Sequence, residues 1–320
     1  MRPCGDTTLP GMKYRRLGKT NLRVSVIGMG TWQFGGEWGK DFSQNEVDAM
    51  FDAARGVGLN LIDTAECYGD HASERLIGGA IQRDRTNWVV ATKFGHKFHG
   101  HMKRTDERSP KDAVEQLEAS LRALRTDYVD LLQYHSIADN EFDNGELQQT
   151  LIRLKEQGKV RHIGNSIRGN ADDHQTVRSD AAQVEALQVI YNRLDRRPET
   201  RDFPYAQQHD LGILARVPLA SGFLSGKYKP GAHFPPNDTR ANYSQQQIDE
   251  KLREVEKIQR EEVPPGVPMA QWALAWCLQH PAVTCVIPGC KDADQVRRNA
   301  AAAELAMVKA DHPQAWKGTA

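Results

Sequence analysis

Short runs rich in valine, isoleucine and leucine alternate with helical patterns along most of this 320-residue chain. Such an alternation is typical of successive β/α units. The predicted strands are VIGMGTW, LNLIDTA, NWVVATKF, DYVDLLQYH, VRHIGNS, ALQVIYN, GILARVPLA and TCVIPG. About eight units in roughly 250 residues favour an α/β fold in which the strands close into a parallel (β/α)8 barrel, the TIM barrel.

The helical patterns between these strands have recognisable ends. Ser109 is suited to cap a helix that begins with Pro110, and Gly158 is suited to end the helix that begins near Gly145. The predicted helices cover residues 43–56, 71–81, 110–124, 145–157, 170–179, 203–209, 268–279 and 292–303. Ahead of the first unit, the turn signal GKTN predicts a β-hairpin within residues 14–26. The proline-rich segment 227–244 predicts a surface loop over the functional face.

An open Rossmann-like sheet is the alternative architecture. Its glycine fingerprint is missing, because after Gly28 and Gly30 the place of the third glycine is taken by Gln33. No linker or low-complexity segment divides the chain. We therefore predict a flexible N-terminal tail at residues 1–12 and a single barrel domain at 13–320.

Charge and cysteine usage exclude several classes of partner. The 42 basic and 42 acidic side chains balance, so no net field favours nucleic acid or an anionic membrane. The longest apolar run, at 272–278, is far shorter than the roughly 20 residues that span a bilayer. Five cysteines without a C-x-x-C pair indicate reduced thiols and hence a cytoplasmic location. No segment marks an oligomer interface.

Polar residues stand where three successive predicted strands end. Asp63 ends the second strand and Tyr68 follows it, Lys93 ends the third, and His135 ends the fourth. Functional residues of such barrels collect at this C-terminal face. A lysine cation would lower the pKa of a tyrosine, an aspartate would pair with that lysine, and a histidine could donate a hydrogen bond to a carbonyl oxygen. Taken singly, each residue is more often part of a structural ion pair or a core side chain, and it is their occurrence at three successive strand ends that favours a functional site.

The same segments resemble the aldo-keto reductase family, from about Met12 to about Ala303. LIDTAECYG is similar to the D-T-A-x-x-Y-G signature, VVATK to the lysine strand and DLLQYH to the histidine strand. The resemblance implies that the four strand-end residues are the family's catalytic tetrad. It further implies that Tyr68 acts as general acid while a nicotinamide hydride reduces an aldehyde or ketone, a small-molecule substrate.

The resemblance also implies a binding site for NADPH. Ser166 and Gln188 match positions that bind the carboxamide, although Ile167 replaces the usual asparagine. Arg216 takes the place of an aromatic residue that stacks on nicotinamide, and its planar guanidinium could also stack. The other implied positions are Leu219, Ser221, Gly222, Lys227, Gly289, Lys291, Gln295 and Asn299.

The phosphate groups of such a cofactor have candidate partners in two loops. The loop 219–227 is rich in small residues, so its backbone N–H groups could reach a pyrophosphate. Lys291, beside a helix start, supplies the positive charge that a 2′-phosphate needs, which favours NADPH over NADH. Arg298 stands where many members of the family carry an acid.

Two other classes of function compete with a reductase. His96, His99 and His101 follow the third strand and could suggest a metal-dependent hydrolase. No acidic ligand lies close to them in this stretch, so we predict no metal site. Some barrels of this kind instead serve as nucleotide-binding regulatory subunits with little turnover, but the intact set of four catalytic residue types argues against that role.

Further side chains stand beside the predicted site. Trp32 and Phe34, at the end of the first strand, either line a substrate pocket or pack in the core. Cys67 and Cys290 adjoin Tyr68 and Lys291, and we interpret them as small buried thiols rather than redox switches. The substrate itself is not predicted, because it depends on the loops after the strands.

Overall fold

The structure is a computed structural model that describes residues 11–169, 173–235 and 238–318. Most of the predicted N-terminal tail therefore lies outside the described residues. Met12, the last residue of that tail, is buried against the hydrophobic core instead. The first part of the helix predicted at 170–179 also lies outside the described residues.

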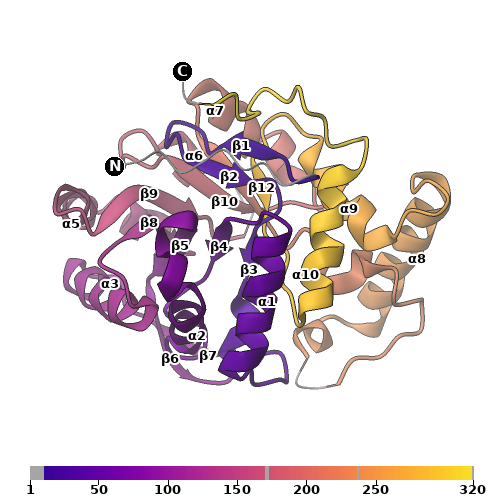
Figure 1. The fold of residues 1–320 in the computed structure, drawn as a ribbon, viewed down its shortest axis with the longest axis horizontal. Helices are drawn as coiled ribbons and strands as arrows, with labels where there is room; N and C mark the ends of the chain where they lie inside the picture. Colours follow the sequence, from indigo (N-terminus) through magenta and orange to yellow (C-terminus); the bar gives the residue numbers. More distant parts are fainter. Residues whose placement is uncertain (1–10, 170–172, 236–237, 319–320) are drawn as a thin grey trace.

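Eight parallel strands form one sheet, in which neighbours follow the order of the chain. They are β3 (Met29–Gly30), β4 (Leu61–Asp63), β5 (Val89–Phe94), β8 (Val129–His135), β9 (Val160–Ser166), β10 (Ala186–Ile190), β11 (Gly212–Arg216) and β12 (Cys285–Val286). Parallel bridges join Ile27 to Val286 and Gly30 to Gly289, so the first and last strands meet. This closure confirms the predicted (β/α)8 barrel (Figure 1).

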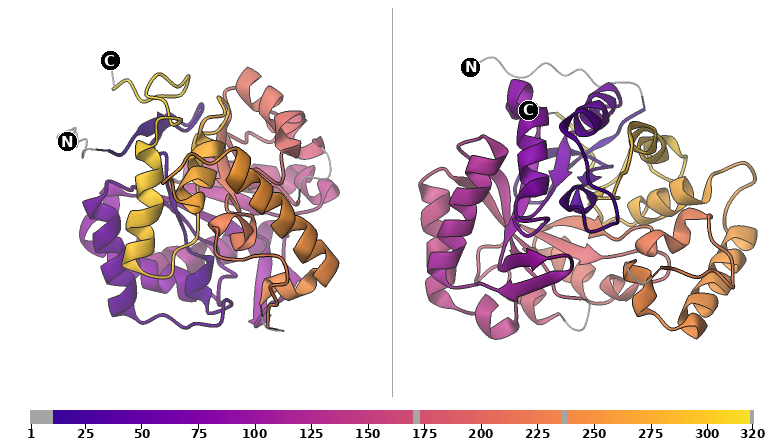
Figure 2. Two further views of the ribbon diagram at one scale, coloured as in Figure 1. Left: turned by 90° about the vertical axis from the view of Figure 1, so that its right-hand side faces the viewer. Right: turned by 90° about the horizontal axis from the view of Figure 1, so that it is seen from below.

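Helices enclose the strands on all sides (Figures 1 and 2). Those predicted within a few residues of their observed bounds are α1 (Gln44–Gly56), α2 (Ala72–Ile81), α3 (Pro110–Leu124), α5 (Gly145–Glu156), α7 (Asp202–Gln208), α9 (Met269–Leu278) and α10 (Ala293–Ala300). Only one turn, α6 (His174–Val177), is helical in the region predicted at 170–179. Within the described residues, none of the helices combines the length and apolar character needed to cross a membrane.

Several elements are present that the sequence patterns above do not predict. The longest is α8 (Gln245–Glu261), which Ser244 begins with a capping box. The others are α4 (Asp139–Phe142) and the antiparallel pair β6 (His96–Gly100) and β7 (Lys103–Asp106). Short 3-10 helices are η1 (Trp32–Gly35), η2 (Gln82–Asn87), η3 (Arg197–Glu199), η4 (Ala220–Ser225), η5 (Thr239–Asn242) and η6 (Ala301–Glu304).

The predicted N-terminal hairpin is confirmed as β1 (Tyr14–Arg16) paired with β2 (Arg23–Ser25). It lies at the end of the barrel opposite to β6 and β7 (Figure 1). The guanidinium of Arg15 is buried there and donates hydrogen bonds to the carbonyl oxygens of Val283 (2.6 Å) and Leu278 (2.8 Å). The hairpin thus closes the N-terminal end of the barrel.

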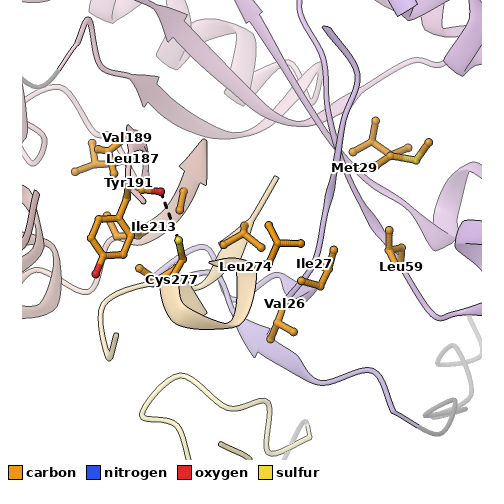
Figure 3. Packing of buried hydrophobic residues seen from close by; sticks show 14 of the residues in the cluster. Val26, Ile27, Met29, Leu59, Leu187, Val189, Tyr191, Ile213, Leu274 and Cys277 are labelled. Carbon is orange, nitrogen blue, oxygen red and sulfur yellow. Dashed lines mark hydrogen bonds between the residues drawn. The ribbon is translucent and has the colours of Figure 1, made fainter. Parts of the chain in front are cut away.

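Two hydrophobic cores hold the fold together. The larger one fills the space between strands and helices, where Cys277 of α9 donates a hydrogen bond to the carbonyl oxygen of Tyr191 (Figure 3). The smaller one fills the barrel interior, where Leu17 and Val24 of the hairpin segment meet apolar strand residues. Those strand residues are Leu61, Val89, Ala91, Leu131, Ala186, Leu214, Cys285 and Ile287. The apolar filling ends below the C-terminal rim.

Candidate active site

A layer of polar side chains covers the apolar interior at the C-terminal ends of the strands. Because strand residues two apart point to the same face, Asp63 follows Leu61 into the barrel. Lys93, Gln133 and Gln188 follow their apolar neighbours in the same way. Asp63 Oδ2 pairs with Lys93 Nζ at 2.9 Å. Asp63 Oδ1 accepts hydrogen bonds from the amides of Gln188 (2.6 Å) and Gln133 (3.3 Å).

The lysine of this layer joins the carboxylate to the phenol. Lys93 Nζ donates to Tyr68 Oη at 3.3 Å and to the carbonyl oxygen of Thr64 at 2.8 Å. Burial is the strongest single influence and opposes the charge of Lys93, but the charge and hydrogen bonds of Asp63 and Tyr68 together outweigh it and raise the pKa of the ammonium above its usual value. Lys93 therefore stays cationic beneath the phenol at neutral pH.

The pKa of Tyr68 departs from the prediction. We expected Lys93 to lower it, but burial of the hydroxyl outweighs the cation and raises the pKa of Tyr68 to about 12. Withdrawal from water disfavours the phenolate more strongly than Lys93 favours it, and the Asp63 charge acts in the same direction as burial. Tyr68 is accordingly a protonated phenol at neutral pH, with a cation beside it.

Close backbone packing positions this tyrosine. Gly69, with φ +67°, lies against η1, where an added Cβ would meet the carbonyl oxygen of Gly35 at 2.5 Å. A residue with a side chain would therefore push the loop of Tyr68 away from η1. From η1, the ring of Trp32 stacks on Tyr68, with ring centroids 6.1 Å apart and an interplanar angle of 26°.

His135 ends β8 beside the phenol, with ring centroids 6.1 Å apart. Burial holds its pKa well below the usual value, and neighbouring cations lower it further. The imidazole is therefore neutral at physiological pH, with one N–H to donate. Its Nδ1 lies 3.7 Å from Cys67 Sγ and 4.0 Å from Glu66 Oε2.

A cavity of about 690 Å³ opens above the polar layer. Many of the predicted site residues line it, namely Trp32, Asp63, Tyr68, His135, Ser166, Gln188, Arg216, Leu219, Ser221, Gly222, Lys227, Gly289, Lys291 and Gln295. Lys93 lies beneath its floor in contact with Tyr68. The structure therefore brings the proposed catalytic residues and most of the proposed cofactor residues to one cavity.

Besides Lys93, two predicted site residues do not line this cavity. Phe34 is 2% exposed and packs against Phe42 in the core, because η1 turns it away from the face that carries Trp32. Asn299 is 4% exposed and donates its amide to Cys290 Sγ at 3.4 Å, since α10 points it inward. Both are packing residues in this structure.

The cavity lining also contains residues that were not predicted as site residues, namely Trp38, His96 and Arg104 near Trp32 and His135, and Tyr228 and Arg240 near η4. Glu37 connects two of the segments that carry them. It is buried and accepts hydrogen bonds from Trp32 Nε1 (2.7 Å), the backbone of Met102 (3.0 Å) and Arg104. This carboxylate ties β7 to η1 across the cavity mouth, a contact between loops that no local pattern in the sequence indicates.

The other side of the cavity has features suited to an anionic nucleotide. Arg216 Nη2 donates to the carbonyl oxygen of Ile167 at 3.0 Å, while its buried Nε has no partner among the described residues. Ser221 and Gly222 have φ values of 56° and 90° in η4, a turn that lines the cavity. The cations there are Lys227, Lys291 and Arg298. These donors and charges match phosphate groups rather than an apolar ligand.

The three histidines of the rival metal-hydrolase interpretation do not converge. His96 Nδ1 lies 3.1 Å from Asp106 Oδ1, His99 Nε2 bonds to the hydroxyl of Thr105, and His101 is exposed. The expectation that no acidic group lies near them is wrong, because the β6–β7 hairpin brings Asp106 beside His96. Of the potential ligand clusters in the described part of the chain, none contains these histidines.

A different cluster has the composition of a metal site. Glu66, Cys67 and His135 offer ligand atoms that lie within 4.8 Å of one another. The groups that depress the pKa of His135 include the cations Lys93, Arg216 and Arg104, which surround it with positive charge. A divalent cation would be repelled by the same charges. The cluster is better suited to hydrogen bonding than to holding a metal.

Comparisons with known proteins place this architecture and site in context. The model of the aldo/keto reductase family matches residues 26–317. An NADH-specific methylglyoxal reductase from Escherichia coli is 30% identical over 94% of this chain and 96% of its own. A probable voltage-gated potassium channel subunit beta from Arabidopsis thaliana is 31% identical, with 92% of each chain covered. The holo structure of aldo-keto reductase AKR11C1 from Bacillus halodurans matches with a TM-score of 0.78 and 30% identity, over 95% of this chain and 94% of its own.

Proposed function

This chain belongs to the aldo/keto reductase family, and we propose that it reduces an aldehyde or ketone to an alcohol, with Tyr68 as the proton donor. One observation carries the proposal. Lys93 contacts both Asp63 (2.9 Å) and Tyr68 (3.3 Å), and the phenol faces the same cavity as His135. An acid, a buried cation to stabilise its conjugate base, and a neutral hydrogen-bond donor are what carbonyl reduction requires.

The chain's own residues have separate tasks in this reaction. Neutral His135 donates a hydrogen bond to the carbonyl oxygen and orients it. The Tyr68 hydroxyl gives its proton to the same oxygen, and Lys93 stabilises the phenolate that forms. Asp63 holds Lys93 in place and balances its charge. When bound, a reduced nicotinamide cofactor supplies the hydride for the carbonyl carbon.

We assign the cofactor to the part of the cavity away from Trp32. Ser166 and Gln188 would hold the carboxamide, with Ser166 Oγ now donating to Gln188 Oε1 at 3.4 Å. Arg216 would stack on the ring, and η4 would bind the pyrophosphate. Lys291 and the nearby Arg298 favour NADPH over NADH. The relative from Escherichia coli is NADH-specific, so an assay of this protein should compare NADPH with NADH.

Loss of reduced-nicotinamide absorbance with NADPH or NADH and a panel of aldehydes and ketones tests the proposal. Replacing Tyr68→Phe removes the proton donor, so we expect turnover to fall by about 10²- to 10⁴-fold, the range for general acid catalysis. Tyr134→Phe is a matched control, since its buried hydroxyl has no partner among the described residues and points into the outer core. Undiminished turnover in Tyr68→Phe would refute the assignment.

A second function is a nucleotide-binding subunit of a larger assembly. The match to the plant protein described as a probable channel subunit supports it. Tight binding of NADPH without turnover of any carbonyl would favour this role, whereas turnover that depends on Tyr68 would favour the reductase. We place either activity in a reducing compartment such as the cytoplasm, because Cys67, Cys277, Cys285 and Cys290 are all unpaired.

A further inference from the structure

A buried carboxyl group and a buried thiol lie against one nitrogen of His135. Glu66 is 3% exposed, and its Oε1 accepts a hydrogen bond from the backbone N–H of His96 at 3.0 Å. Its Oε2 has no partner among the described residues and lies 4.0 Å from His135 Nδ1. Cys67 Sγ lies 3.7 Å from the same nitrogen. No step of the proposed reaction uses either group.

We propose that Glu66, together with Cys67, is a positioning residue that sets which ring nitrogen of His135 carries the proton. The proposal rests on the reductase function given above, in which His135 must donate to a carbonyl oxygen. A neutral imidazole has one N–H and one acceptor nitrogen. Because Nδ1 faces Glu66 and Cys67, the substrate can meet only Nε2, and Nε2 donates only if Nδ1 is unprotonated.

The protonation of Glu66 decides between the two forms of the ring. As a carboxylic acid, Glu66 carries its proton on Oε2, because Oε1 already accepts from the His96 backbone. The Oε2–H group and the Cys67 thiol then both present donors to Nδ1, which leaves the ring proton on Nε2. As a carboxylate, Glu66 is an acceptor, so it draws the proton to Nδ1. His135 then has no hydrogen to offer the substrate.

Electrostatics make Glu66 the group of this cluster that titrates near neutrality. Burial raises its pKa to about 8, and Glu74 of α2 acts in the same direction. The backbone N–H of His96 and the charge of Lys93 oppose this rise but do not cancel it. Burial also raises the pKa of the Cys67 thiol, so that it remains S–H. Tyr68 loses its proton only near pH 12.

The groups packed around His135 keep the ring itself from titrating in this range. Its pKa is depressed by burial and by groups from two strands and the β6–β7 hairpin, namely Lys93 of β5, His96 of β6, Arg216 of β11 and Arg104 of β7. A change near pH 8 therefore moves the ring proton between nitrogens without charging the imidazole. The reaction would lose its oxygen-binding donor while Tyr68 is still an acid.

Long-range ¹H–¹⁵N spectra of ¹⁵N-histidine-labelled protein report the tautomer directly, without turnover. The His135→Asn variant identifies the signal among the 11 histidines. From about pH 6.5 to about pH 9.5 we expect the proton of wild-type His135 to move from Nε2 to Nδ1. In Glu66→Gln, an amide N–H mimics the protonated acid at every pH, so the proton should stay on Nε2.

Rates measured on the same proteins give the second readout. We expect kcat/KM for carbonyl reduction by the wild type to fall about tenfold from about pH 7 to about pH 9. At a pH about one unit above its pKa, the Glu66 carboxyl group is only about one-tenth protonated. In Glu66→Gln this alkaline loss should vanish. Glu199→Gln, at a glutamate that bonds to Tyr191 and Arg196 and does not line the cavity of His135, should retain it.

The outcomes separate this inference from the proposed function. A wild-type His135 whose tautomer is constant across this pH range overturns the inference, whatever the turnover. A Glu66→Gln variant that keeps the alkaline loss overturns it as well. A tautomer that switches in a protein that reduces no carbonyl compound overturns the reductase proposal, while the control of His135 by Glu66 stands.

Discussion

The two ends of the barrel treat buried charge in opposite ways. At the N-terminal end, Arg15 is buried among apolar residues, and its guanidinium donates only to backbone carbonyl oxygens. At the C-terminal end, Lys93 and Asp63 bind one another and contact a tyrosine that faces a cavity. The same barrel therefore supports stability at one end and chemistry at the other, because the inward-facing residues of β4, β5, β8 and β10 are apolar first and polar toward the C-terminal end.

The difference also shows in the protonation equilibria. Burial lowers the pKa of Arg15 to about 10, which leaves the guanidinium charged at neutral pH and bonded to fixed carbonyls. At the other end burial raises the pKa of Glu66 to about 8 and that of Tyr68 to about 12, so both carry protons near neutrality. Tyr68, unlike Arg15, lines a cavity in which its proton can reach a ligand.

The largest change that this comparison predicts comes from Lys93→Met. Removing the cation leaves Asp63 as an unpaired buried carboxylate, so the free energy of unfolding should fall by about 3–5 kcal/mol and turnover should be lost with it. Urea denaturation and the reduction assay measure the two effects. Adding Asp63→Asn should restore much of the stability and none of the turnover; a double variant as unstable as Lys93→Met would contradict the charge argument.

Leu17→Ala tests the opposite end of the barrel. Leu17 is fully buried in the interior core, so its truncation should lower the free energy of unfolding by about 2–5 kcal/mol. Turnover per folded molecule should not change, since the site lies at the other end. Val177→Ala, at a side chain 47% exposed, should have little effect on either quantity. A fall in kcat for Leu17→Ala would show that the two ends are coupled.

The raised pKa of Glu66 predicts that the free energy of unfolding depends on pH. Its folded pKa of about 8 lies above the usual 4.5, so between these values the folded chain holds a proton that the unfolded chain has released. The stability that this group contributes is therefore lost as the pH rises from 4.5 to about 8. Above about pH 8, Glu66 is ionised in both states and no longer makes the stability depend on pH. Glu66→Gln removes that loss, so its advantage in thermal unfolding should grow from about pH 5 to about pH 8.5 and reach about 1–3 kcal/mol. An advantage that is equal at both pH values would show that Glu66 is already ionised.

The smallest predicted effect lies at the exposed edge of the cavity. Lys291→Met should weaken NADPH binding by about three- to tenfold and leave NADH binding unchanged, because one exposed charge contributes about 1 kcal/mol. Fluorescence titration measures both constants. Arg297→Met serves as control, since Arg297 pairs with Asp294 and does not line the cavity. Equal losses for the two cofactors would place the 2′-phosphate elsewhere.

Much of the fold and part of the site can be predicted from local patterns. Ser109 and Pro110 mark the start of α3 because capping depends on residues a few positions apart. The same reasoning would have found α8, whose Ser244 and Gln247 form a capping box and whose buried residues recur at helical spacing. The contacts of Glu37 with Arg104 and of Glu66 with His135 join different loops, so no local pattern predicts them.

The sequence by itself determined the order of strands and helices and the residue types that end each strand, because hydrophobic period and capping act over a few neighbouring positions. Only the tertiary structure decided how those residues behave. Closure of the barrel brought Asp63, Lys93 and Tyr68 within bonding distance and turned Phe34 and Asn299 into the core. It also buried Tyr68 so deeply that desolvation outweighs the adjacent cation, since solvation depends on every surrounding element and not on any single segment.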